Sequence, residues 1–304
     1  MLSKSDDIVL VLVCDNHFST MLAALLKSIE TNQDNKGLIN IYVVDDGISR
    51  RNRKKIMQTL DSAHIKLIWI PIKATIPDHV VFPVDGSTFP KNVYARLFIP
   101  YFLPPHVQRA IYLDTDTLVL SNIRNLWDTD LKGLAIGAVQ DLSETVSSDW
   151  GGIPNYKALG IPPTSKYFNS GVLVIDVEQW RAEHAPEAIV HHIQANIEHA
   201  TFPDQYGLNV HFANRWHELD PRWNAYSQGQ QRSPFIIHFT RMKPIYSGYH
   251  FNADYAKTFF DYLRLTPYRR FKPYSEGYRL LIKLRQLILK KRAKLNWTFI
   301  RQTS

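Results

Sequence analysis

Two pairs of aspartates, each separated by one residue, are the features of this sequence that most directly suggest chemistry. Asp114 and Asp116 stand between two short apolar runs, so they mark a point where a buried strand reaches the surface. In open α/β sheets, ligands bind at the carboxyl ends of the strands. Two carboxylates around a turn at such an end can face one divalent cation. Asp128 and Asp130 occupy a polar turn and fit a helix cap or a surface loop. The first pair is therefore the candidate metal site, with simple turn capping as the alternative.

His238 is the best-placed nitrogen ligand for such a site, because it lies near the end of an apolar strand expected at 235–239. An oxygen-rich site that gains one imidazole favours Mn²⁺ somewhat over Mg²⁺. Taken alone, a histidine at a strand end is more often a structural hydrogen-bonding residue than a metal ligand. Its role therefore depends on whether the fold brings it to the aspartates.

Apolar strands and amphipathic helices alternate along the first part of the chain. This alternation predicts an α/β sheet that is at least partly parallel. The expected strands are 8–14, 39–45, 65–70, 110–113, 118–120, 134–139, 171–175 and 235–239, and the expected helices are 22–29, 50–60, 92–99 and 184–199. The Gly/Pro/Ser-rich stretch 143–163 is expected to be a flexible loop.

Composition narrows the class of protein. The chain has 304 residues, 45% of them hydrophobic, which excludes a disordered chain, a collagen and a coiled coil. The apolar run 8–14 is too short to cross a bilayer, and no signal peptide is recognisable. A single cysteine excludes an internal disulfide and a multi-cysteine zinc site. With no signal peptide and no disulfide, we expect a cytoplasmic protein. Gly-x-Ser-x-Gly, His-Glu-x-x-His and Walker patterns are absent, so hydrolase, zincin and P-loop functions lack support.

The net charge of +8 is concentrated at the end of the chain. From Arg269 onward there are eleven basic residues and one acidic residue, whereas the rest of the chain holds 25 basic and 27 acidic residues. An amphipathic helix is expected between Arg279 and Leu295, and a basic helix of this kind suits an anionic membrane surface. An ordinary docked C-terminal helix is the alternative. Nothing in the body of the chain supports a nucleic-acid partner.

Short blocks in a fixed order resemble glycosyltransferase family 8, the retaining nucleotide-sugar transferases that include glycogenin and bacterial lipopolysaccharide galactosyl- and glucosyltransferases. The blocks are Cys-Asp-Asn-His-Phe at 14–18, Tyr-Ala-Arg-Leu at 94–97, Ile-Tyr-Leu-Asp-Thr-Asp at 111–116, Leu-Trp-Asp-Thr-Asp-Leu at 126–131, Tyr-Phe-Asn-Ser-Gly-Val at 167–172, Asp-Gln at 204–205 with Leu-Asn at 208–209, and His-Phe-Thr at 238–240 with Lys-Pro at 243–244. The segment 216–224 is similar to bacterial members labelled general stress protein A. The resemblance implies a GT-A fold, which is an α/β, Rossmann-like mixed sheet flanked by helices, in a single domain with a C-terminal helical tail.

The resemblance also implies roles for individual residues. Asp114, Asp116 and His238 match the family's ligands for Mn²⁺, with Mg²⁺ as the alternative. The residues that match positions around the UDP-sugar are Val13, Cys14 and Asp15 at the uracil, Arg96 and Asn169 at the sugar, Lys243 at the diphosphate, and Asp114 and Thr115. The residues that match catalytic positions beside the sugar are Asp141, Asp204 and Gln205. Because the amide of Gln205 is a poor nucleophile, same-face attack by the acceptor hydroxyl is favoured over a covalent intermediate.

These matches predict a transferase that moves glucose or galactose from a UDP-sugar to a cell-surface glycan or glycolipid. Residues 1–265 are expected to form the nucleotide-sugar transferase domain, and 266–304 a basic tail that attaches it peripherally to the inner face of the cell membrane. Two alternatives stay open: a protein- or self-glucosylating transferase, and a catalytically inactive member that serves as a membrane-binding module.

Some positions depart from the family pattern. Arg241 replaces a common glycine after His-Phe-Thr, and Ile245 replaces a common tryptophan after Lys-Pro. Tyr206 stands where the family often has aspartate, and Arg241 is itself a candidate phosphate contact. Three tryptophans are candidates for stacking on sugars, and at least two of them are expected in the core: Trp150, Trp216 and Trp223.

Overall fold

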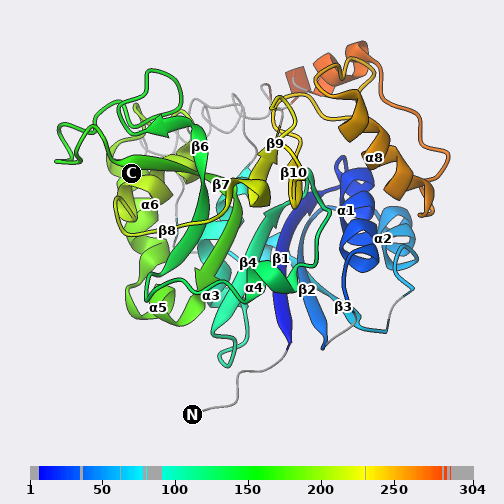
Figure 1. Ribbon diagram of the computed structural model, residues 1–304, viewed down its shortest axis with the longest axis horizontal. Helices are drawn as coiled ribbons and strands as arrows, with labels where there is room; N and C mark the ends of the chain where they lie inside the picture. Colours follow the sequence, from blue (N-terminus) through cyan, green and yellow to red (C-terminus); the bar gives the residue numbers. More distant parts are fainter. Residues whose placement is uncertain are drawn as a thin grey trace, which may run out of the picture.

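A seven-stranded mixed sheet forms the centre of the molecule (Figure 1). The computed structural model describes residues 7–34, 37–61, 63–77, 80, 91–229, 231–282, 284–285 and 288. In spatial order the strands are β3 (Ile65–Pro71), β2 (Ile39–Asp46), β1 (Ile8–Asp15), β4 (Arg109–Asp114), β7 (Lys166–Asp176), β6 (Ile136–Thr145) and β8 (His217–Glu218). The first four are mutually parallel, and β7 runs antiparallel to both β4 and β6. The carboxyl ends of the four parallel strands therefore lie at the same edge of the sheet.

Helices cover both faces of this sheet, which explains why β1 is apolar on both sides. Leu10 and Leu12 face a core shared with α1 (Ser19–Thr31), α2 (Arg50–Met57) and α8 (Ala253–Arg264). Val9 and Val11 face the opposite core, because side chains of a strand alternate between its faces. On that side lie the 3₁₀ segment η2 (Lys91–Phe98) and the helices α3 (Ile99–Phe102), α5 (Val177–Ala182), α6 (Ala185–Ala195) and α7 (Pro203–His211).

A second, three-stranded sheet lies beside the end of β4. Its order is β5 (Thr117–Val119), β10 (Ile236–His238) and β9 (Ala225–Tyr226), with β10 antiparallel to β5 and parallel to β9. The 3₁₀ turn η3 (Pro221–Asn224) leads into β9, and the short elements η1 (Ile72–Ala74) and α4 (Arg124–Trp127) complete the fold. This small sheet brings the end of β10 back to the turn after β4.

Most of the strands expected from the sequence are confirmed, with four differences elsewhere. The helix expected at 92–99 is the 3₁₀ segment η2, and the one expected at 50–60 ends at Met57. The helix expected at 184–199 ends at Ala195. The stretch 143–163 is not a loose loop: β6 continues to Thr145, and the following turns bury Val146, Ile153 and Ile161 against Tyr167 and Tyr206. A Gly/Pro/Ser-rich composition concealed these few apolar anchors.

The first part of the basic tail packs against the body of the molecule. Tyr274 stacks on His17, with ring centroids 5.1 Å apart, and on Tyr278, 4.7 Å apart. Helical residues follow at 276–282, and the side chains of Leu281 and Leu284 are exposed. Most of the expected amphipathic helix, including residues 289–295, lies outside the described residues. Among the residues described, none of the helices combines the length and apolar character that spanning a bilayer requires.

Candidate active site

The sheet topology explains how His238 meets the distant pair Asp114 and Asp116. Asp114 ends β4 and pairs in register with Val13 near the end of β1. The turn after it carries Asp116 directly into β5, where the neighbouring Thr117 pairs with His238 of β10. The backbone N–H of Phe239 donates to the carbonyl of Asp116 at 2.9 Å, which closes the arrangement. Strand pairing alone therefore places the histidine beside both aspartates.

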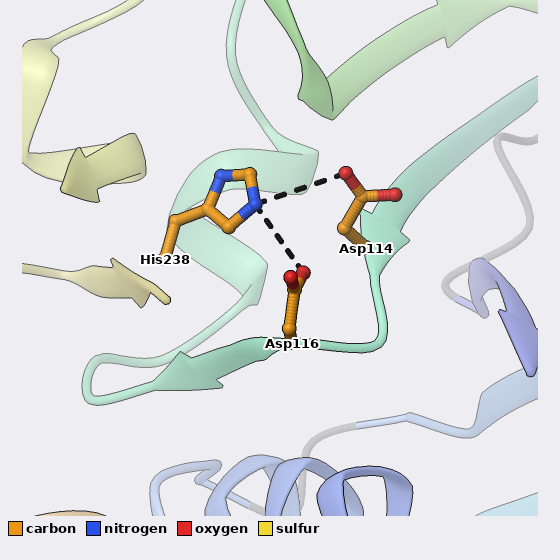
Figure 2. A group of neighbouring side chains, drawn as sticks. All are labelled: Asp114, Asp116 and His238. Atoms are coloured by element: carbon orange, nitrogen blue, oxygen red, sulfur yellow. Dashed lines mark ion pairs between the residues drawn. The ribbon is translucent and has the colours of Figure 1, made fainter. Parts of the chain in front are cut away.

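Nε2 of His238 points at both carboxylates, as Figure 2 shows. It lies 3.3 Å from Oδ1 of Asp116 and 3.8 Å from Oδ2 of Asp114. One ligand atom from each of the three residues lies within 4.8 Å of the others. Two carboxylates and one imidazole on this scale form a ligand set suited to a divalent cation. The first Asp-x-Asp pair is thus part of a cluster, whereas Asp128 is the exposed C-cap of α4.

Gly171 of β7 keeps the space in front of this cluster open. A Cβ atom added to it would collide with the His238 ring and lie 2.8 Å from Oδ2 of Asp114. Any side chain here would therefore enter the space between two of the three ligands. An open cradle lined by two carboxylates and an imidazole fits a metal ion well.

A line of amide side chains fixes the orientation of His238. Its Nδ1 lies 2.8 Å from Oδ1 of Asn224, whose amide group donates to Oδ1 of Asn169 at 2.9 Å. The amide group of Asn169 donates in turn to Oδ2 of Asp141 at 3.0 Å. Because each amide donates toward the carboxylate, Oδ1 of Asn224 is left to accept from Nδ1–H. The histidine can then present the lone pair of Nε2 to a metal ion held by the two aspartates.

Lys243 supplies a cation at the same place. Its Nζ lies 2.5 Å from Oδ2 of Asp116 and donates to the carbonyl of Phe239 at 2.6 Å. Burial by itself would raise the pKa of Asp116, but Lys243 and His238 outweigh burial and hold that pKa below its usual range. Asp116 is therefore charged at neutral pH.

Arg96 is buried between two acidic side chains. Its guanidinium lies 2.8 Å from Oδ1 of Asp114 and 3.2 Å from Oδ2 of Asp204, and it donates to the carbonyl of Ser170 at 2.8 Å. Burial raises the pKa of Asp204, and Arg96 offsets this only in part. The hydroxyl of Tyr112 also donates to Asp114, at 2.7 Å. Asp114 is therefore held by Arg96 and Tyr112 before any ligand binds.

Asp141, Asn169 and Gln205 form one connected group next to the cluster. Oε1 of Gln205 accepts from the Asn169 amide and from the Ser170 N–H, both at 3.1 Å. Its amide group donates to Oδ2 of Asp141 at 3.4 Å, and Ser143 donates to Oδ1 of the same carboxylate at 3.0 Å. These side chains are rigidly oriented, as a site that must place a substrate precisely in space requires.

Residues at the end of β1 lie on the other side of Asp114. The Thr115 hydroxyl donates to the carbonyl of Val13 at 2.5 Å. The thiol of Cys14 is buried, and Oδ1 of Asp15 accepts from the backbone N–H of Phe18 at 2.9 Å. The structure thus brings all the residues expected around a donor to one edge of the sheet.

Two residues that sequence reasoning did not select contribute directly to the geometry. Asn224 orients His238, and Gly171 leaves room beside it. Both lie within blocks that carry the family resemblance, at 216–224 and 167–172. A glycine inside an apolar strand is itself a signal of close approach by another group, whereas nothing in the local sequence distinguishes Asn224 from a turn residue.

Solved structures with the same architecture identify the class of the fold. An active-site mutant of LgtC superimposes with a TM-score of 0.71 over 90% of this chain and 99% of its own, at 23% identity. The galactosyltransferase LgtC in complex with donor and acceptor sugar analogues gives 0.68 over the same shares, at 22% identity. The mixed sheet flanked by helices is therefore a GT-A-like fold, and an Asp-x-Asp turn with a distant histidine at its edge is consistent with a divalent metal site.

The family follows from the sequence comparison. The model of glycosyl transferase family 8 matches residues 9–247. General stress protein A of Bacillus subtilis (strain 168) is 30% identical over 226 residues, which are 73% of this chain and 75% of that protein. The chain belongs to glycosyltransferase family 8, a family of UDP-sugar-dependent retaining enzymes.

Proposed function

We propose that this chain is a Mn²⁺-assisted hexosyltransferase that moves glucose or galactose from its UDP-sugar to a glycan or glycolipid of the cell surface. The convergence of Asp114, Asp116 and His238, with ligand atoms within 4.8 Å, carries the proposal. The imidazole favours Mn²⁺ over Mg²⁺. When bound, the ion would supply positive charge at the diphosphate as the glycosyl–phosphate bond breaks.

The nucleotide would lie along the end of β1. Its uracil would meet the backbone of Val13 and Cys14 and the side chain of Asp15, with Thr115 holding this segment against the metal-binding turn. Lys243 would exchange part of its contact with Asp116 for the diphosphate, because an ammonium group with three donors can serve both. This assignment is supported by the pairing of Val13 with Asp114 and by the contact of Lys243 with Asp116.

The sugar would lie over the group formed by Asp141, Asn169, Asp204 and Gln205, with Arg96 beside it. Positive charge builds on the anomeric carbon as the phosphate leaves, and buried carboxylates stabilise it. Gln205 is an unreactive amide whose oxygen already accepts hydrogen bonds from Asn169 and Ser170. We therefore propose that the acceptor hydroxyl attacks the face from which phosphate departs: its oxygen bonds to the anomeric carbon, the carbon–oxygen bond to phosphate breaks, and the proton passes to the departing phosphate oxygen. A sugar adduct trapped on Asp204 would contradict this step.

The tail, 266–304, would attach the enzyme to the inner face of the cell membrane. Exposed apolar side chains at Leu280, Leu281, Leu284 and Ile288, together with eleven basic residues against one acidic residue from Arg269 onward, support an anionic lipid surface as the partner. A cut after Tyr278 spares the stacking of Tyr274 on His17. This truncation should release the protein from vesicles containing anionic lipid while UDP-sugar binding is kept; unchanged vesicle binding would refute the attachment.

Thermal unfolding with and without Mn²⁺ tests the activity. UDP-glucose or UDP-galactose should raise the melting temperature only with the metal present. The size of the shift follows from binding, since a ligand at 100 times its dissociation constant adds about 2.7 kcal/mol of stability. Asp116→Asn should abolish this shift, and Asp128→Asn, in the second Asp-x-Asp pair, is the matched control. No shift with any UDP-sugar would favour an inactive family member. A mass increase of the protein on incubation with UDP-glucose alone would indicate self-glucosylation instead.

A further inference from the structure

An exposed tryptophan and an arginine lie together and are linked through neighbouring residues to the candidate active site. Trp150 is 52% exposed, whereas Trp223 is buried and Trp216 packs on Phe168, as expected for two of the three tryptophans. The guanidinium of Arg241 lies over the Trp150 ring, 5.6 Å from its centroid. A flat aromatic surface next to a cation has the chemistry of a sugar-binding surface that also accepts negative charge.

The loop that carries Trp150, residues 146–163, is held in place by its own small core. Val146 and Ile153 are buried against Tyr206, whose hydroxyl donates to Oδ1 of Asn155 at 2.8 Å. Tyr206 directly follows Gln205 in α7, so the helix that carries a proposed catalytic residue also anchors this loop. The exposure of Trp150 is therefore a property of a packed segment and not of a loose one.

Short links join the Trp150 loop to the proposed donor site. Gly151 packs so closely on Ser143 that a Cβ atom would collide with the Ser143 hydroxyl, which donates to Asp141. The Trp150 ring meets Phe202 edge-on at 6.0 Å, and Phe202 caps α7 two residues before Asp204. The tryptophan thus lies beside the part of the site that would hold the sugar, away from Val13 at the nucleotide end.

Arg241 adopts a backbone conformation that does not suit it. Its φ is +60°, in the left-handed region that favours glycine. A non-glycine residue in this region is strained, and such strain gathers at functional sites. Arg241 also lies only three residues after His238, so a guanidinium is kept close in sequence to a proposed metal ligand where glycine would be easier to accommodate.

We propose that Trp150 and Arg241 form the acceptor-binding surface and that the acceptor is a saccharide carrying an acidic group. The acceptor sugar ring lies on the indole, and its phosphate or carboxylate group pairs with the guanidinium. This inference rests on the proposed transferase function and adds the chemical class of the acceptor. It predicts discrimination against neutral sugars, because the cation next to the ring is satisfied only by an acidic ligand.

Ligand-observed NMR on the full chain with Mg²⁺ and UDP tests the proposal. The probes are glucose and galactose, their 6-phosphates and their uronic acids, so that phosphate and carboxylate are separated in two stereochemical series. At low salt at least one acidic probe should bind tenfold or more tightly than its neutral counterpart. Arg241→Gly should remove this preference. Trp150→Ala should reduce, by about tenfold, the affinity of each probe that the wild type binds. Equal binding of acidic and neutral probes, or a preference that survives Arg241→Gly, would overturn the proposal.

A matched control separates this surface from the fold and from the donor site. Lys132, in the turn before β6, is another basic residue with a positive φ, +54°, and Lys132→Gly should leave all probes unaffected. Arg241→Gly should fold at least as well as the wild type, because glycine relieves the strained φ. UDP-glucose should bind the wild type, Trp150→Ala and Lys132→Gly equally. If it fails to bind the wild type, the proposed function is wrong; if it binds but the probes ignore both substitutions, only the acceptor assignment is wrong.

Discussion

Replacing Asn224 with alanine should weaken metal binding without removing any metal ligand. His238 is 4% exposed, and its Nδ1 has the Asn224 oxygen as partner at 2.8 Å. Without this acceptor, a buried N–H at Nδ1 loses its hydrogen bond. The proton then moves to Nε2, where it can donate to Oδ1 of Asp116 at 3.3 Å. That tautomer has no lone pair at Nε2, the nitrogen that faces the two aspartates.

The size of the effect follows from the burial of the ring. An unsatisfied buried donor costs about 1–3 kcal/mol, and this cost is what selects the tautomer that binds metal. Loss of a comparable hydrogen-bond partner behind a ligand histidine weakens metal binding about 10- to 100-fold, which is about 1.4–2.7 kcal/mol. Asn224→Ala should therefore raise the Mn²⁺ dissociation constant by one to two orders of magnitude.

Calorimetric titration of Mn²⁺ into the UDP-bound protein measures this constant, and long-range ¹⁵N NMR of the metal-free protein reports the tautomer of His238. Asn224→Asp keeps an acceptor for Nδ1–H and should retain binding within about tenfold. Asn252→Ala is the matched control: it removes the N-cap of α8, where the side chain accepts from Tyr255 N–H at 3.0 Å, and costs about 1 kcal/mol of stability. It should leave the Mn²⁺ constant unchanged. An unchanged constant in Asn224→Ala would refute the reasoning.

Three further predictions concern other parts of the molecule. Gly171→Ala should weaken Mn²⁺ binding at least about tenfold, because its Cβ would intrude on His238; calorimetry with an unchanged constant would contradict this. Lys243→Met should tighten the binding of Mn²⁺ in the absence of UDP and weaken the binding of UDP about tenfold, since a hydrogen bond to a charged group contributes about 1.5–3 kcal/mol. Weaker binding of both ligands would refute the proposal that Lys243 serves both Asp116 and the diphosphate. Burial lowers the pKa of His211 to about 4, so the folded protein binds fewer protons than the unfolded chain between about pH 4 and 6.5, and stability should rise over that range by about 1–3 kcal/mol. His211→Gln should flatten this rise in melting temperature, and an equally steep profile would show that other groups cause it.

Much of the fold is predictable from the sequence because buried parallel strands carry a strong local signal. The run at 8–14 is apolar without alternation, as expected for a strand covered on both faces, and it is β1. The candidate ligands could also be selected in advance, since strand ends and acidic turns are visible in sequence. The 3₁₀ form of 91–98 was not predictable, because its apolar spacing fits an α-helix equally well.

The supporting contacts are less accessible to sequence reasoning because they depend on pairing between distant segments. Asn224 acquires its role only when β9 pairs with β10 and brings it to His238, fourteen residues further along the chain. Trp150 is likewise exposed because Val146 and Ile153 occupy the small core beneath its loop. Asn224 is an ordinary residue for a turn, and Trp150 could be selected from the sequence only as one of three tryptophans. In both cases the tertiary neighbours decide the role.

A crystal structure of the protein soaked with UDP and Mn²⁺, with data collected at the manganese absorption edge, tests the central claim most directly. The anomalous peak should lie among Oδ1 or Oδ2 of Asp114 and Asp116 and Nε2 of His238, at about 2.0–2.3 Å from each ligand atom. It should also contact the diphosphate. A peak elsewhere, or UDP bound with the histidine ring turned away from the ion, would contradict the account.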